Sequence, residues 1–147
     1  MRIGLLAAAL GVVFSGLTHA DLRAARAEPN LEKRSKLALG NALALYTNAR
    51  QAYQQGDTNQ VKADATEIQE SVELAYTSLE DTGKDPRKSP KWFKQAEIET
   101  RDLLRKIDGF QQEMDFNDRP VLDAVKAKVQ QVHDSLLLQL MEGKKHK

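Results

Sequence analysis

Residues 89–114, SPKWFKQAEIETRDLLRKIDGFQQEM, decide the fold of this chain. Apolar side chains recur in this stretch in steps of three and four residues. That spacing lines them up on one side of an α-helix, which turns once in about 3.6 residues. Ser89 suits the N-cap, and Pro90 suits the first helical position, where a missing N–H does no harm. The stretch predicts a helix with one buried seam, made of Phe93, Ala96, Thr100, Leu103, Ile107, Phe110 and Met114.

Three further segments show the same alternation on either side of this stretch. The first covers about residues 30–55 and ends at Gly56, a residue type common at helix C-termini. The second follows a capping sequence at residues 57–60 and ends at Gly83, and the last opens at residues 118–120 and ends at Gly143. Their predicted seams are Leu39, Ala42, Tyr46, Ala49 and Tyr53, then Val61, Ala65, Ile68, Val72, Ala75 and Leu79, and finally Leu122, Val125, Val129, Val132, Leu136 and Leu140.

Four helical segments of similar length predict an all-α protein. Each helix would be about 37 Å long at 1.5 Å per residue. Short connections favour antiparallel neighbours, so we expect an antiparallel up-down-up-down four-helix bundle over residues 30–142. Tyr46 and Thr100 should lie near the middle of this bundle and approach each other or share a water, because buried polar groups need partners.

The N-terminal residues predict export from the cell. Arg2 precedes an apolar run, and Thr18-His19-Ala20 has the small-x-small pattern that signal peptidase cleaves. We expect a signal peptide over residues 1–20, with an alternative cut after Ala27, and a short linker over residues 21–29. The apolar run is shorter than the roughly 20 residues of a membrane-spanning helix. The mature chain is predicted to lie in the periplasm or outside the cell, with no transmembrane segment and with a basic tail at residues 143–147.

The composition excludes several kinds of chemistry. The 147 residues contain no cysteine, which rules out disulfides, thiolate nucleophiles and cysteine-ligated zinc. The formal net charge of +1 includes Arg2 of the signal, so the mature chain is neutral and gives no sign of nucleic-acid binding. No phosphate-binding loop or catalytic motif is present, and Asp64, Glu67, Glu70 and Glu73 have the spacing of a solvated polar face. We therefore expect a protein that is not an enzyme.

Charge is unevenly distributed along the predicted bundle. Folding the four segments back on one another gathers lysines and arginines at one end and carboxylates at the other. The cations of the basic end are either solvated and balanced by Glu80 and Asp81, or they form a docking surface for an anionic partner, a protein or an envelope component. Trp92 would then serve as an amphipathic anchor. The candidate docking residues are Lys84, Arg87, Lys88, Lys91, Trp92 and Lys94.

His133 is the only histidine in the predicted helices. A cysteine-free exported chain of four matched helices, with Ser89-Pro90 opening the third and a histidine late in the fourth, resembles the small periplasmic four-helix b-type cytochromes. The resemblance implies a haem-binding electron carrier in which His133 is an iron ligand. The second ligand in that family is a methionine on the first helix, and residues 30–55 contain neither methionine nor histidine.

Three functional interpretations follow from these patterns. The first is an exported, non-enzymatic bundle without a cofactor, an envelope interaction or accessory protein with a basic end. The first alternative is the electron carrier with haem b held by His133. The second alternative is a periplasmic chaperone, although a bundle whose apolar residues all face inward leaves little surface to grip a client. The sequence leaves the oligomeric state open.

Overall fold

The computed structural model describes residues 22–143, and all regular secondary structure in that range is helical. A short helix, α1 (Leu22–Ala27), precedes four main helices, α2 (Leu31–Gln54), α3 (Thr58–Asp81), α4 (Lys91–Glu113) and α5 (Asp123–Glu142). A 3-10 turn, η1 (Arg119–Leu122), leads into α5. The predicted all-α class with four main helices is therefore confirmed. The predicted signal peptide, residues 1–20, and all but the first residue of the predicted basic tail lie outside the described residues.

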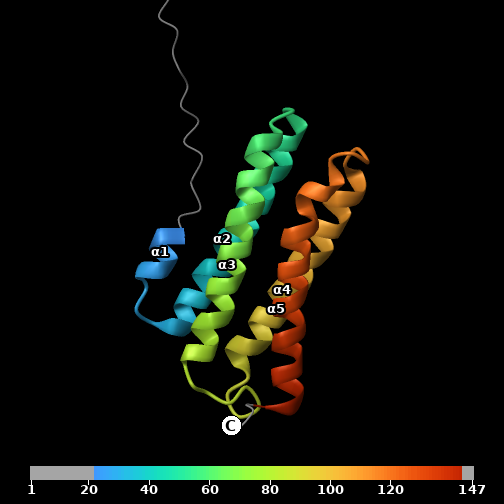
Figure 1. The fold of residues 1–147 in the computed structure, drawn as a ribbon. Helices are drawn as coiled ribbons and strands as arrows, with labels where there is room; N and C mark the ends of the chain where they lie inside the picture. The colour runs from blue at the N-terminus through green and yellow to red at the C-terminus, as the bar shows by residue number, and fades with distance from the viewer. Residues whose placement is uncertain (1–21, 144–147) are drawn as a thin grey trace, which may run out of the picture.

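The helices α2 and α3 form one hairpin, and α4 and α5 form another (Figure 1). Between α2 and α3, Asn41 Nδ2 donates to Ser71 Oγ at 2.9 Å and Asn48 Nδ2 donates to Asp64 Oδ2 at 2.8 Å. Residue numbers therefore rise along α2 as they fall along α3. Half of the buried residues of these two helices are alanine or serine, and such small side chains let helices approach closely.

The two hairpins pack so that α3 lies beside α5 and α2 lies beside α4, while α2 does not reach α5 (Figure 1). Lys128 Nζ lies 3.0 Å from Glu73 Oε2, and further along both helices Gln139 Nε2 lies 3.0 Å from the Tyr76 hydroxyl. Residue numbers thus rise together along α3 and α5. The expectation that every neighbour is antiparallel is not met across the hairpins.

The connection between α3 and α4 permits this order of helices. It comprises residues 82–90 and crosses the end of the bundle from α3 to the diagonally placed α4 (Figure 1). Extended chain reaches roughly 3.3 Å per residue, and neighbouring helix axes lie about 8–10 Å apart, so the connection is long enough for this crossing. The chain can therefore place α4 either directly beside α3 or diagonally across the bundle from it.

The core consists of the predicted seams. Every seam residue is buried except Tyr53 and Leu140, which are half-buried and pack against the others. The row on α2 is wider than predicted, because Ala38, Leu45 and Ala52 are buried as well. The three-four spacing therefore identified the inward face of all four main helices correctly.

Tyr46 and Thr100 are both buried, as expected, and the hydrogen bonds found for their hydroxyls are local ones. Thr100 Oγ1 donates to the carbonyl oxygen of Ala96 at 2.8 Å, one turn back on its own helix. The Tyr46 hydroxyl accepts a long hydrogen bond from Arg50 Nη1 at 3.5 Å, again within one helix. Local partners satisfy both hydroxyls, so no contact across the core is needed.

The segment expected as a linker, residues 21–29, contains the helix α1. Leu22 and Ala25 are buried against α2 and α3, and Arg26 Nη2 lies 3.9 Å from Glu70 Oε2. Asn30 then caps α2, its Oδ1 accepting the Lys33 backbone N–H at 2.9 Å. Thus α1 is part of the packed domain. Among residues 22–143, no helix has the length and apolar character needed to cross a membrane.

Candidate functional site

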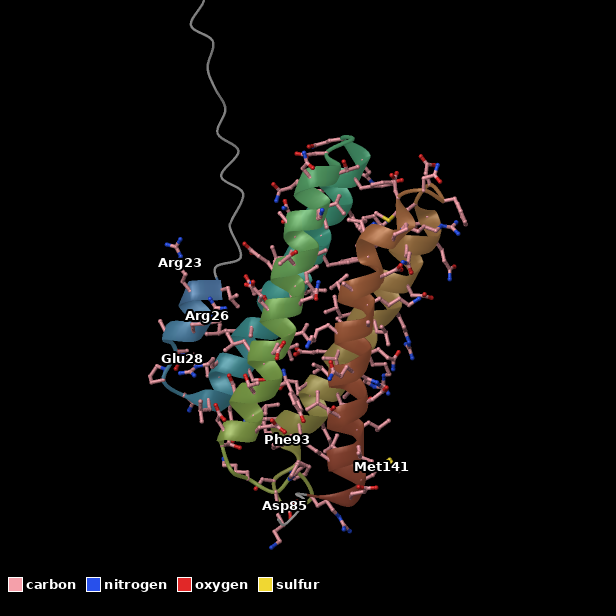
Figure 2. The ribbon with its side chains drawn as sticks, in the orientation of Figure 1. Arg23, Arg26, Glu28, Asp85, Phe93 and Met141 are labelled. Carbon is pink, nitrogen blue, oxygen red and sulfur yellow. The ribbon has the colours of Figure 1, made fainter. Side chains whose placement is uncertain are left out.

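The six predicted docking residues lie at one end of the bundle, where the chain passes from α3 into α4. We call residues 84–94 the basic loop. Asp85, labelled in Figure 2, organises its turn: its carbonyl oxygen accepts the backbone N–H of Lys88 at 3.0 Å and of Ser89 at 2.9 Å, and its Oδ1 accepts that of Arg87 at 2.9 Å. The end of α5 packs on the same turn, because a Cβ added at Gly143 would lie 2.9 Å from Arg87 Cδ. The basic loop therefore has a defined shape.

Four of the six docking residues are exposed cations that form no ion pair with any residue in the range 22–143. They are Arg87, Lys88, Lys91 and Lys94. Lys84 differs, because its ammonium pairs with Glu32 at the start of α2. Glu80, one of the two carboxylates expected to balance this end internally, accepts hydrogen bonds from Tyr76 and Gln139 instead. Much of the positive charge of the basic loop is thus available to a partner.

The N-terminus of α4 adds to this positive potential. Pro90 occupies the N-cap position and no side chain caps the helix, so the expectation that Ser89 is the N-cap is wrong. The first turn of α4 contains no acidic residue. Unpaired backbone N–H groups and the positive end of the helix dipole therefore lie beside Lys91 and Lys94.

Trp92 is half-buried. The Lys91 ammonium lies 5.1 Å from the centre of its ring, a cation–π contact between neighbouring residues. The ring packs against the core and borders a groove of about 900 Å³ that is shared with α1 and α2. Trp92 therefore lies where the basic loop meets this groove.

A cleft of about 360 Å³ lies on the other side of the basic loop, between α3, α5 and the start of α4. Phe93, labelled in Figure 2, borders it, and so do Tyr76, Glu80 and Gln139. The Tyr76 hydroxyl donates to Glu80 Oε1 at 2.7 Å and accepts from Gln139 Nε2 at 3.0 Å. Burial of the hydroxyl, together with its hydrogen bond to this carboxylate, raises the pKa of Tyr76 to about 12. Tyr76 stays neutral at ordinary pH and cannot act as a base.

His133, the candidate haem ligand, lies between α4 and α5 with a side chain that is only 12% exposed. Its Nε2 lies 3.0 Å from Glu97 Oε1, and its Nδ1 lies 3.3 Å from Asp134 Oδ1. Iron coordination would have to displace one of these carboxylates, and α2 offers no methionine or histidine as a second ligand. The surroundings of His133 therefore do not fit a haem iron. Within the described range, no three His, Asp or Glu side chains gather in a way that could hold a metal ion.

Three buried polar residues of α3 were not predicted from the sequence. Asp64, expected on a solvated face, is 3% exposed and accepts from Asn48 and Gln60, both at 2.8 Å. Ser71 and Ser78 follow it at seven-residue intervals and are buried too. That interval repeats the inward face of a helix, so it is the signal that could have identified them.

The chain was also compared with known proteins. No protein family, no curated protein and no solved structure matches it. Its function therefore has to be inferred from the contacts and charges of residues 22–143.

Proposed function

We propose that this chain is an exported, non-enzymatic helical-bundle protein that docks through its basic loop onto an anionic component of the cell envelope. The observation that carries the proposal is a group of four exposed cations that form no ion pair with any of residues 22–143: Arg87, Lys88, Lys91 and Lys94. A cation that stabilised the bundle would have a carboxylate beside it, as Lys84 has in Glu32.

The charges of the basic loop are close enough in sequence to act together. Arg87 and Lys88 are adjacent in the chain, and Lys91 and Lys94 lie one turn apart on α4, with about 5–6 Å between their Cβ atoms. These spacings are shorter than the roughly 8 Å over which exposed charges are screened at physiological ionic strength. Each lysine or arginine held near an anionic surface contributes about 1 kcal/mol. Four of them give roughly 4 kcal/mol, which is enough for reversible docking.

Charge reversal in the basic loop tests the proposal. The variant Lys88→Glu/Lys91→Glu/Lys94→Glu should bind phosphatidylglycerol vesicles and polyglutamate at least about tenfold more weakly than the original chain, measured by co-sedimentation and calorimetry. The matched control Lys62→Glu/Arg105→Glu/Lys106→Glu changes the net charge equally on exposed positions elsewhere and should retain binding. Equal losses in both variants, or no loss in the first, would contradict docking through the basic loop.

The packing of α1 supports one of the two signal-peptide cuts. Cleavage after Ala27 would remove Leu22 and Ala25, which are buried against the bundle, whereas cleavage after Ala20 keeps both. We propose the cut after Ala20. The intact mass of the exported protein should correspond to a chain that begins at Asp21, and a mass corresponding to a start at Glu28 would contradict it.

A further inference from the structure

Three exposed apolar side chains gather near the C-terminal end of α5. Among residues 22–143, seven large apolar side chains are exposed, and three of the seven fall within five residues. They are Leu137, Leu138 and Met141, which are 40%, 44% and 69% exposed. Residues three and four positions apart are neighbours on a helix surface, so Met141 lies beside both leucines. We call these three residues the apolar patch.

The apolar patch adjoins the basic loop. Leu138 borders the cleft of about 360 Å³ together with Pro86 of the loop. Just beyond the end of α5, a Cβ added at Gly143 would lie 2.9 Å from Arg87 Cδ. Met141 lies at the same end of the bundle as the turn of the basic loop (Figure 2). The apolar patch and the cations of this turn are therefore parts of one surface.

The α4 part of the basic loop also reaches the level of the apolar patch. In the hairpin of α4 and α5, His133 Nε2 lies 3.0 Å from Glu97 Oε1. Lys94 comes about one turn before Glu97, and Leu137 comes about one turn after His133. Because the two helices of a hairpin run in opposite directions, Lys94 and Leu137 lie at the same level of the bundle.

Exposed carboxylates are fewer than exposed cations around the apolar patch. Glu80 accepts hydrogen bonds from Tyr76 and Gln139, as described above. The end of α3 contributes the exposed Asp81, and the end of α5 contributes the exposed Glu142. Against these two stand the four cations of the basic loop that form no ion pair with residues 22–143. The surface around the apolar patch thus favours an anionic partner.

The combination of cations with an apolar patch favours a lipid surface over other anionic partners. An anionic polymer would neutralise the cations and would leave the apolar patch in water. An anionic lipid bilayer supplies charged headgroups and hydrocarbon next to each other, and attachment to a bilayer is most stable where these two signals act together. Lysine suits this position, because its apolar stem can lie in the interface while its ammonium stays at the headgroups. Protein interfaces depend instead on aromatic and arginine anchors, among which leucine is under-represented.

We propose that the basic end of the bundle docks on an anionic lipid bilayer, with the cations of the basic loop at the headgroup phosphates and the apolar patch inserted among the outermost methylene groups of the acyl chains. This inference rests on the proposed function, docking through the basic loop, and names its partner. The bundle attaches to the surface of the bilayer by this end.

Removal of the apolar patch without any change of charge tests the insertion. Leu138→Ser/Met141→Ser should bind phosphatidylglycerol vesicles at least about tenfold more weakly than the original chain in co-sedimentation. The same variant should bind polyglutamate as the original chain does, because that polymer offers no hydrocarbon. The matched control Leu43→Ser/Phe116→Ser changes two apolar residues away from the basic loop, 44% and 79% exposed, and should retain both activities. The melting temperature of each double variant checks that it remains folded.

Oxidation of Met141 gives a readout that needs no variant. Hydrogen peroxide converts exposed methionine to its sulfoxide, and Met141 is 69% exposed whereas Met114 is 3% exposed. Phosphatidylglycerol vesicles should slow the oxidation of Met141 several-fold, measured by mass spectrometry of peptides. Polyglutamate should not slow it, and neither should vesicles of phosphatidylcholine, which carry no net charge. Met114 serves as the internal control and should be oxidised slowly throughout.

Two results would overturn the lipid surface. One is full binding of phosphatidylglycerol vesicles by Leu138→Ser/Met141→Ser, and the other is a Met141 that is oxidised equally fast with and without bound vesicles. If the triple reversal of Lys88, Lys91 and Lys94 still weakens binding in those cases, docking through the basic loop stands and insertion alone fails. An original chain that binds polyglutamate but no vesicles would also overturn the lipid surface and leave the proposed function intact.

Discussion

The two ends of the bundle carry opposite charge and use it differently. At the end formed by η1 and the turn between α2 and α3, carboxylates join separate helices: Glu113 Oε2 lies 2.5 Å from Arg50 Nη2, and Asp118 Oδ2 accepts from the Tyr53 hydroxyl at 3.0 Å. At the other end, the cations of the basic loop other than Lys84 form no ion pair within the part of the chain that the structure describes. Charged side chains that stabilise the fold find partners within it. Those without partners are the candidates for contact with another molecule.

In and around the connection between α4 and α5, most charged side chains have partners within the fold. Asp108 Oδ1 lies 2.5 Å from Lys126 Nζ, and Asp123 Oδ1 accepts from Gln111 Nε2 at 2.7 Å. The guanidinium of Arg119 donates to the carbonyl oxygen of Met114 at 3.2 Å. These contacts fix the turn onto its own helices, and of its carboxylates the exposed Asp115 forms no ion pair with residues 22–143.

The largest expected effect on the free energy of unfolding is at Phe110, at the acidic end, and it is compared with the effect at Phe93, at the basic end. Phe110 is 3% exposed, and its ring meets those of Tyr46 and Tyr53 at centroid distances of 6.1 and 5.8 Å. Phe110→Ala should lower the free energy of unfolding by about 3–5 kcal/mol in urea denaturation. Phe93→Ala should cost less, because Phe93 borders the 360 Å³ cleft and solvent can fill the space that it leaves. A larger loss from Phe93→Ala would mean that the basic end is the better packed of the two.

The next effect concerns a hydrogen bond that closes the acidic end. The Tyr53 hydroxyl donates to Asp118 Oδ2 and accepts the Asp115 backbone N–H at 2.9 Å. Tyr53→Phe removes both bonds and should lower the free energy of unfolding by about 1–2 kcal/mol. Lys88→Ala, which removes no contact, should change it by less than about 0.5 kcal/mol. Similar losses from the two variants would erase the distinction between the ends.

A smaller effect is expected at Glu99, which borders the cleft between α2 and α4. Burial raises the pKa of its carboxyl group, partly opposed by Gln95 and Lys36. A pKa that is higher in the fold than in the unfolded chain means that stability is lost as the pH rises through it. Glu99→Gln stays neutral and should be more stable than the original chain at about pH 7, with no difference near pH 3. A destabilised variant at neutral pH would show that the charged carboxylate is favoured in the fold.

The smallest effect is spectroscopic and concerns Tyr76 at the basic end. Its pKa of about 12 means that the absorbance of the ionised phenol should rise late in an alkaline titration, and Tyr76→Phe should remove that late step. The hydroxyl contributes stability below the unfolded pKa of about 10, and this contribution is lost as the pH rises toward 12. Loss of the absorbance step near pH 10 instead of near pH 12 in Tyr76→Phe would show that the hydroxyl is solvated.

Much of the fold could be predicted from the sequence, because burial of Ile68, Val129 and the other seam residues follows from three-four spacing alone. The order of the helices could not be predicted, since all four seams are similar and residues 82–90 can span either arrangement. Asp64 was expected to be exposed because it is charged. It is buried because hydrogen bonds from Asn48 on α2 and Gln60 on α3 satisfy its carboxylate.

One of the two candidate sites could likewise be predicted from the sequence and the other could not. The cations of the basic loop could be predicted because they lie close together in the sequence, and local charge does not depend on how the hairpins are ordered. The apolar patch could not, because Leu138 and Met141 lie beside the basic loop only where the end of α5 packs on its turn. Only the folded chain brings these residues together.

Amide chemical-shift mapping tests the contrast between the ends most directly. Nitrogen-labelled protein would be titrated with a short-chain phosphatidylglycerol that remains soluble as a monomer. Because four cations of the basic loop form no ion pair with residues 22–143, we expect shifts concentrated in residues 84–94 and absent around Arg50, Glu113 and η1. Shifts of equal size at both ends, or confined to the acidic end, would contradict the account.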